Sequence, residues 1–333
     1  MNLQLREILF AGSSKRSLHY PMHRLKNWQL LAICVLTWGT TWYVITFQIG
    51  LAPPEVSVAL RFGLAGAVVL AMCALRGIAL RFTWRDHARL ALQGGFMYGL
   101  SYLCVYHAEQ HVVSGLVAVG YSASPLVSGL GARALFGSRV SPRFLFGGLL
   151  GVVGVALIFW PEFGNASHRA ANVAAGAVSG NVVLGALFTV ASVLLSSVGS
   201  LTASRNRAHG LPFWPALGFG LVYGAALCAA SALVQGHRCA LPAVASWWAA
   251  LLYLSMAGSV LTFACFLTLQ ERIGPGPAGS VGVLTPLLAL LVSIGFERFQ
   301  PDVLTLLGAA LAVGGNVLIL RPGRRRGRAA SPA

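Results

Sequence analysis

Arg61 lies inside the apolar segment 56–76, further from an end than any other charged side chain in such a segment. A charge inside a bilayer is costly and normally faces a cavity, a partner group or backbone carbonyls. Arg61 therefore either attracts a carboxylate or another anionic group of a ligand, or has a structural role. In the structural role the guanidinium extends to the membrane surface or caps a neighbouring helix end. Both interpretations stay open from the sequence.

Aromatic side chains recur at helical spacing in two apolar segments. Trp38 and Trp42 are four residues apart and share one helix face, and Tyr98 and Tyr102 do the same in another segment. Such stripes either line a cavity for apolar or cationic groups or serve packing and an interfacial belt. We favour the cavity for these four, which lie deep in their segments, and the belt for Tyr106.

Pro125 and Pro286 each interrupt an apolar segment, and each follows a hydroxyl residue, Ser124 or Thr285. Proline removes a helical hydrogen bond and frees a carbonyl, which inside a membrane is tolerated where it lines a cavity. We interpret both prolines as hinges. The two hydroxyls either contact a ligand or bond back to their own helix. The predicted substrate-binding cavity is lined by Trp38, Trp42, Arg61, Tyr98, Tyr102, Tyr121, Ser124, Tyr253, Thr262, Phe263 and Thr285.

Metal and redox chemistry have little support. His107 and His111 are spaced to share Zn²⁺ on a helix, with Glu109 between them, but a third ligand is missing, so we predict a solvated helix end. The six cysteines form no C-x-x-C pair. We expect no metal, no cofactor and no catalytic residue. No Asp or Glu lies at the centre of an apolar segment, so a carboxylate proton relay has no obvious carrier and facilitated transport stays open.

The elements that must position these residues are membrane helices. The mean hydropathy is +0.74 and only 10% of residues are charged, against about a quarter in soluble domains. Each apolar segment has roughly 20 residues, enough for a helix to cross about 30 Å of hydrocarbon. We predict an all-α integral membrane protein with ten transmembrane helices. The predicted spans are 28–48, 56–76, 88–107, 112–133, 143–160, 180–203, 213–234, 246–269, 276–295 and 302–320.

The net charge of +16 follows the membrane topology. Twenty Lys and Arg residues flank the spans on one side and three on the other, in alternation along the chain. This is the positive-inside pattern, and it predicts a multi-pass protein of the cell membrane with both termini in the cytoplasm. A nucleic-acid surface would need the charge on one folded face, so nucleic acid is not an expected partner.

The chain contains an internal repeat. Residues 100–126 and 261–287 match without a gap at an offset of 161, including Ser124-Pro125 against Thr285-Pro286. Each half has five spans, an odd number, so the second half enters the membrane in the opposite orientation and the repeats are inverted. The predicted organisation is a disordered cytoplasmic tail 1–27, a first five-helix repeat 28–160, an external link 161–179, a second repeat 180–320 and a basic cytoplasmic tail 321–333.

Short motifs resemble a known family. The first span carries Trp38-Gly39-Thr40-Thr41-Trp42, and the second carries Pro53-Pro54 followed by Arg61-Phe62. The second half ends with Pro286, Phe296-Glu297-Arg298, Pro301, Gly308 and Gly314. The first half has the corresponding Pro125, Gly137-Ser138-Arg139, Pro142, Gly148 and Gly154, with Ser138 where the family usually has Glu. In their order and spacing these motifs resemble the EamA-type branch of the drug/metabolite transporter superfamily, over about 28–320.

The resemblance implies a carrier of small metabolites, amino acids or drugs, often directed outward. We therefore expect an exporter that works by alternating access between inverted repeats, in a bacterial inner membrane, with the lipid bilayer and a small-molecule substrate as its partners. The alternatives are a membrane-embedded enzyme and a non-transporting receptor or scaffold. Substrate, coupling ion and oligomeric state stay open, as does the choice of Met1 or Met22 as the start.

Overall fold

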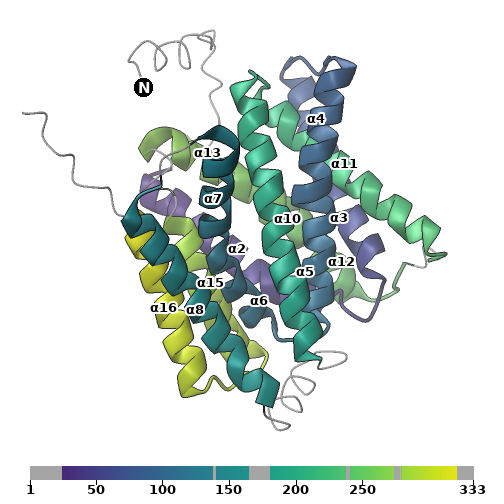
Figure 1. The fold of residues 1–333 in the computed structure, drawn as a ribbon. Coiled ribbons are helices and arrows are strands. Elements are labelled where there is room, and N and C mark those ends of the chain that lie inside the picture. The colour runs from purple at the N-terminus through teal and green to yellow at the C-terminus, as the bar shows by residue number, and fades with distance from the viewer. Residues whose placement is uncertain are drawn as a thin grey trace, which may run out of the picture.

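The structure, a computed structural model, describes residues 25–137, 140–164, 181–237, 241–273, 278 and 280–320. The predictions for the two tails and for most of the link 161–179 lie outside these residues, apart from 25–27 and 161–164. Within the described residues every regular element is a helix. The helices pack into one bundle, shown in Figure 1.

The first half begins with α2 (Asn27–Thr46) and α3 (Pro54–Leu75). It continues with α4 (Trp84–Gly94), the π-helical segment η2 (Gly95–Leu100), α5 (Ser101–Glu109), α6 (Ser114–Gly120), the 3₁₀ turn η3 (Tyr121–Ala123), α7 (Ser124–Phe136) and α8 (Pro142–Gly164). The second half contains α10 (Val182–Ala208), α11 (Phe213–Val234), α12 (Ala245–Ser255), the π-helical segment η4 (Met256–Leu261), α13 (Thr262–Ile273), α15 (Ser280–Phe296) and α16 (Val303–Leu320). Each predicted span overlaps one of these helical stretches.

In the described chain, seven helical stretches are long and apolar enough to cross a membrane. Helices α15 and α16 are apolar but shorter. The stretch from α4 to α5 is not among the seven, and α4 carries Arg85, Asp86 and Arg89 near its start. The fold is therefore that of a multi-pass helical membrane protein, as the composition predicts.

The most extensive helix contacts join a helix of the first half to one of the second. Helix α8 packs along α16, and α3 packs along α11 on the opposite side of the molecule (Figure 1). Between these pairs, α2 contacts α15 and α13, and α10 contacts α7 and α5. The π segments follow the same scheme, since η2 lies on α11 and α10 while η4 lies on α3 and α2. The interior is thus built from both halves.

Glycines bring α8 and α16 into backbone contact. A Cβ added at Gly147 would lie 2.6 Å from the carbonyl oxygen of Gly315, and one added at Gly308 would lie 2.5 Å from that of Gly154. Only glycine permits this approach, as expected from the small-residue spacing of membrane helix pairs. The four glycines also obey the offset of 161, because 147 corresponds to 308 and 154 to 315.

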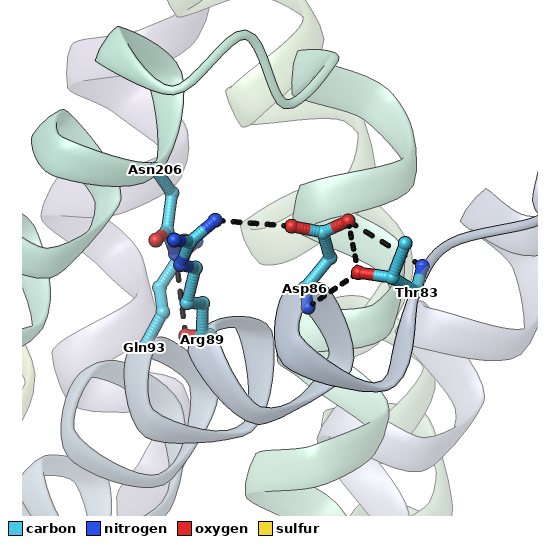
Figure 2. A network of polar contacts seen from close by, with 5 residues as sticks. All are labelled: Thr83, Asp86, Arg89, Gln93 and Asn206. Carbon is cyan, nitrogen blue, oxygen red and sulfur yellow. Dashed lines mark hydrogen bonds and ion pairs between the residues drawn. The ribbon is translucent and has the colours of Figure 1, made fainter.

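A polar network joins α4 to α10 at one end of the bundle (Figure 2). Asp86 accepts a hydrogen bond of 2.7 Å from Thr83 Oγ1, which caps α4, and lies 3.1 Å from Arg89 Nη1. The Thr83 hydrogen bonds, with Arg89 nearby, hold the pKa of Asp86 below its usual range. From α10, Asn206 Nδ2 donates to the Arg89 carbonyl at 3.2 Å and to Gln93 Oε1 at 2.9 Å. The network fixes the start of α4 against the second half.

Gly315→Val should destabilise the protein by about 1–3 kcal/mol, because its side chain meets the α8 backbone. A Cβ at Gly315 already lies 2.9 Å from the nitrogen of Gly151. Gly314→Val is the matched control, since a Cβ at Gly314 meets nothing within 4 Å. The measurement is the temperature at which the purified protein loses monodispersity in detergent. Equal melting of the two variants would contradict close packing of α8 on α16.

Candidate functional site

A cavity of about 200 Å³ lies between the two halves. Its walls come from α2, α3, α5, α6, η3 and α7 of the first half and from α15 of the second. The lining residues are Trp38, Thr41, Trp42, Ile45, Arg61, Tyr102, Val105, Ala118, Tyr121, Ser124, Gly282, Thr285 and Pro286. The structure thus brings together seven of the eleven residues predicted for a cavity, and one of the two predicted hinges.

Arg61 is buried at this cavity, with 2% of its surface exposed. Its guanidinium carbon lies 4.8 Å from the centre of the Tyr102 ring and 5.0 Å from that of Phe62. Nε and Nη1 have no hydrogen-bond partner. The guanidinium therefore neither extends to a membrane surface nor caps a helix end through these two nitrogens, and the cation is held by aromatic faces.

Two aromatic side chains form one wall of the cavity, and hydrogen bonds on the side away from the cavity hold this wall in position. Trp42 and Tyr121 meet edge to face with ring centres 5.2 Å apart. The Tyr121 hydroxyl lies 3.0 Å from Ser101 Oγ, which donates to the carbonyl of Ser192 on α10 at 3.1 Å. This chain of contacts joins the cavity wall to α5 and α10, so the Tyr121 ring is positioned by both halves.

The π segments adjoin the cavity. At η4 the wider turn leaves carbonyls that accept side-chain hydrogen bonds. Ser259 Oγ donates to the carbonyl of Leu254, at the end of α12, at 3.0 Å, and Thr262 Oγ1 donates to the carbonyl of Ala257 at 2.6 Å. The carbonyl of Gly258 accepts from Trp38 Nε1 at 3.1 Å. In the first half Tyr102 follows η2 directly and lines the cavity. Each break in helical geometry thus sets the position of a cavity side chain.

The two prolines have different local structures. Pro286 lies within α15, where it cannot donate to the carbonyl of Gly282, and Gly282 lines the cavity. Pro125 lies in the first turn of α7, directly after the 3₁₀ turn η3, and does not line the cavity itself. The helix is interrupted before Pro125 and continuous through Pro286. Their role as hinges stays a prediction.

Four predicted residues lie away from this cavity. Tyr98 and Phe263 line a second hollow near α10 and α11. The Tyr253 hydroxyl bonds to Thr40 Oγ1 at 2.6 Å, and Thr262 is buried with its hydroxyl bonded to its own helix. The sequence places these four residues at the same depth in the membrane as the cavity, but their side chains contact other neighbours.

Several lining residues were not predicted. Thr41, Ile45, Val105 and Ala118 are ordinary apolar or hydroxyl residues with no chemical signal in the sequence. Thr41 and Ile45 extend the helix face of Trp38 and Trp42, which helical spacing could have shown. Gly282 lies on the face of Thr285 and Pro286, and a Cβ there would meet nothing within 4 Å.

Two predictions near the end of α5 need correction. Tyr106 does not belong to an interfacial belt: it is 1% exposed, and its hydroxyl donates to Gln48 Oε1 at 2.7 Å. The helix end with His107 and His111 is solvated only in part: the His107 side chain is 30% exposed, but Glu109 between the two histidines is 2% exposed and its carboxylate oxygens have no hydrogen-bond partner. Packing against neighbouring helices, which a single span does not reveal, buries both Tyr106 and Glu109.

Other acidic side chains near the helix ends are also buried, and these have partners. Glu55 lies 3.4 Å from His107 Nε2 and 3.8 Å from His237 Nε2. Glu297 accepts hydrogen bonds from Ser293 and, at 3.0 Å, from Ser114 Oγ at the start of α6. A carboxylate there complements the positive end of the helix dipole, so Glu297 joins α15 to α6.

Trp38→Phe should destabilise the protein by about 1–3 kcal/mol, because it removes the donor to Gly258 inside the bundle. Trp248→Phe is the matched control. Trp248 Nε1 donates to the carbonyl of Pro242 at 2.9 Å, but Trp248 is 43% exposed, so in the variant other groups outside the bundle can donate to this carbonyl. Thermal unfolding of both purified variants measures the difference. A loss as large for Trp248→Phe as for Trp38→Phe would contradict this role of the indole.

Comparison with known proteins identifies the family. Residues 27–160 and 183–321 each match the EamA-like transporter family. The chain is 28% identical over 269 residues to the uncharacterized inner membrane transporter YedA of Escherichia coli K12, covering 80% of this chain and 81% of YedA. It is 23% identical over 307 residues to the uncharacterized transporter YvbV of Bacillus subtilis, covering 91% and 93%.

A third relative is protein PecM of Dickeya dadantii, 24% identical over 273 residues, with 82% of this chain and 84% of PecM covered. A protein of known crystal structure superposes with a TM-score of 0.60 over 88% of this chain and 96% of its own, at 22% identity, which concerns the fold alone. The two family matches together span most of the described helices. The chain belongs to the EamA-like transporter family.

Proposed function

We propose that this protein is a carrier in which two inverted five-helix repeats, 28–160 and 180–320, alternate in exposing a central site to the two sides of a bacterial inner membrane. The solute is a small amphipathic metabolite that occupies the cavity between the halves. Both termini lie in the cytoplasm, as the charge alternation favours. Export is the direction that the family resemblance implies.

The observation that carries this proposal is the cavity of about 200 Å³ that Arg61 and Tyr121 of the first half line together with Thr285 and Pro286 of the second. A site between repeats, at the depth of broken helices, is the layout of secondary transporters. Trp38, Trp42, Arg61, Tyr102, Tyr121 and Ser124 from the first half and Thr285 from the second are the proposed substrate contacts. Pro286 and Pro125 are the proposed hinges, because proline weakens a helix where it must bend.

The internal repeat also supports the proposal. The π segments begin at residues 95 and 256 and end at 100 and 261, an offset of 161 at both ends. The helix contacts keep the same relation, because the pair α2 and α15 corresponds to the pair α10 and α7. The pair α2 and α13 likewise corresponds to α10 and α5. A two-fold relation between the halves is the simplest arrangement with these properties.

The cavity favours transport over catalysis. The described residues that line it include no His, Cys, Asp or Glu, so Ser124 and Thr285 have no neighbouring base to activate them. The family and the names of its relatives point the same way. A receptor does not require broken helices on both sides of its binding site. A carrier that works by alternating access does, because its helices must bend.

Gly282→Trp should lower transport about tenfold or more, because the indole enters the space that the solute occupies. Gly295→Trp is the matched control on the same helix: a Cβ at either glycine meets nothing within 4 Å, but Gly295 does not line the cavity. Both variants are compared in proteoliposomes, or by metabolite export from overexpressing cells. Normal transport by folded Gly282→Trp protein would exclude this cavity as the route.

Reporters fused at equivalent points of the two halves should face opposite sides of the membrane. Gly77 follows α3 and Gly236 follows α11, the corresponding helix. Alkaline phosphatase, active only outside the cytoplasm, should be inactive after Gly77 and active after Gly236. Green fluorescent protein should show the reverse. The same reporter result at both sites would mean that the repeats are parallel.

A further inference from the structure

Two nitrogens of the Arg61 guanidinium, Nε and Nη1, have no hydrogen-bond partner in this structure. The Arg61 side chain is buried at the cavity. The rings of Phe62 and Tyr102 cover the guanidinium and stabilise a cation only in part. Arginine offers a planar set of donors that suits a carboxylate, which can accept two hydrogen bonds from it. An anion that displaces part of the aromatic cover would complete the site.

A second unmet polar group lines the same cavity from the other half. Thr285 Oγ1 is buried without a hydrogen-bond partner, unlike Thr262 and Thr268, whose hydroxyls bond back to their own helix. Buried hydroxyls normally find a partner, so an orphan at a cavity marks a place for a ligand atom. Arg61 and Thr285 lie on opposite halves, so one ligand group bound by both would link them.

The rest of the cavity is suited to an apolar body. Trp38, Trp42, Ile45, Val105 and Pro286 supply aromatic and aliphatic surface. The volume of about 200 Å³ is somewhat larger than the roughly 150 Å³ cavity that holds a benzene molecule in another protein. A single ring or a short branched chain with one polar group therefore fits, and a large drug does not.

No acidic side chain is among the described residues that line the cavity. Glu109 interacts electrostatically with Arg61 but lies outside the lining, and Glu297 is held by Ser114 and Ser293. A primary ammonium would thus find no carboxylate in the cavity and would be repelled by Arg61. The site therefore disfavours cations and gains nothing from the ammonium of a zwitterion.

Resting on the proposed function, we propose that the substrate class is small monocarboxylates with an apolar or aromatic body, bound through their carboxylate by Arg61 and Thr285. The ring or alkyl body lies against Trp38 and Trp42. The preference is for a plain monoanion over an amino acid of the same size.

Four ligands of matched shape test this on the purified full chain in nanodiscs near neutral pH: phenylacetate, phenylglycine, phenethylamine and 2-phenylethanol. Isothermal titration calorimetry measures their affinities. Phenylacetate should bind about tenfold more tightly than each of the others, the scale of a hydrogen bond to a charged group. Equal affinities, a preference for the amine or the amino acid, or no binding of phenylacetate would overturn the proposal. This comparison uses the unaltered protein, so it stands even if a variant fails to fold.

Substitutions at Arg61 and Thr285 then test whether these residues bind the carboxylate of the ligand. Arg61→Gln should reduce the affinity for phenylacetate to that for 2-phenylethanol, and Arg61→Lys should keep a weaker anion preference. Thr285→Val, which keeps the shape and removes the hydroxyl, should weaken phenylacetate binding several-fold. Arg85→Gln is the control: Arg85 also covers an aromatic ring, that of Trp84, but is exposed and away from the cavity. Unchanged selectivity in folded Arg61→Gln protein would contradict the assignment.

Transport in proteoliposomes separates the two proposals. Anion-selective binding without movement of phenylacetate would overturn the carrier function and leave the binding site intact. Movement of another solute by a protein that does not prefer phenylacetate would overturn the substrate class and leave the carrier function intact.

Discussion

Inside a bilayer, backbone carbonyls and charged side chains have no water to bind, so each must find a partner in the protein or face a cavity. The cavity of this protein lies where that requirement is hardest to meet. In the π segment η4, the carbonyls of Ala257 and Gly258 accept from Thr262 and Trp38, and the Leu254 carbonyl just before η4 accepts from Ser259. Pro286 leaves the carbonyl of Gly282 without its usual donor, at a residue that lines the cavity. The breaks in the helices thus meet this requirement in two ways, through side-chain donors at η4 and beside the cavity at Gly282.

The backbone of this protein is repeated, but the cavity lining is not. At the offset of 161, Trp38 corresponds to Gly199 and Arg61 to Val222, while Tyr102 corresponds to Phe263. The first half therefore supplies the cation and most of the aromatic surface, and the second supplies Gly282, Thr285 and Pro286. In the proposed carrier, duplication supplies the paired breaks that two similar packings would use. The side chains that select a solute would then need to exist only once, since one central site would serve both packings.

Much of this arrangement could be predicted from the sequence, because hydrophobic runs and helix breakers are local signals. The apolar segments predicted the helices, and the repeated Ser-Pro and Thr-Pro pairs predicted the region of the cavity. Which side chains of a helix face the cavity could not be predicted residue by residue, because this depends on the rotation of the helix about its axis. Tyr98 and Tyr102 share a helix face, yet η2 widens the helix before Tyr102, and only Tyr102 lines the cavity. Burial of Glu109 was missed for a similar reason, since it depends on neighbours more than a hundred residues away in the chain.

Buried acidic and basic side chains lie at different places in the bundle. Glu55 and Glu297 are buried near helix ends with His107 or serine hydroxyls as partners, whereas Arg61 is buried at the cavity beside aromatic rings. Coulomb interactions are stronger at a given distance where the effective dielectric constant is low. Glu109 interacts electrostatically with Arg61 from outside the lining and leaves Nε and Nη1 of the guanidinium without a hydrogen-bond partner. Had Glu109 formed a direct ion pair with Arg61, a ligand would have to break that pair before binding. In the proposed site no such pair has to be broken, so Nε and Nη1 of the guanidinium stay available to an anion.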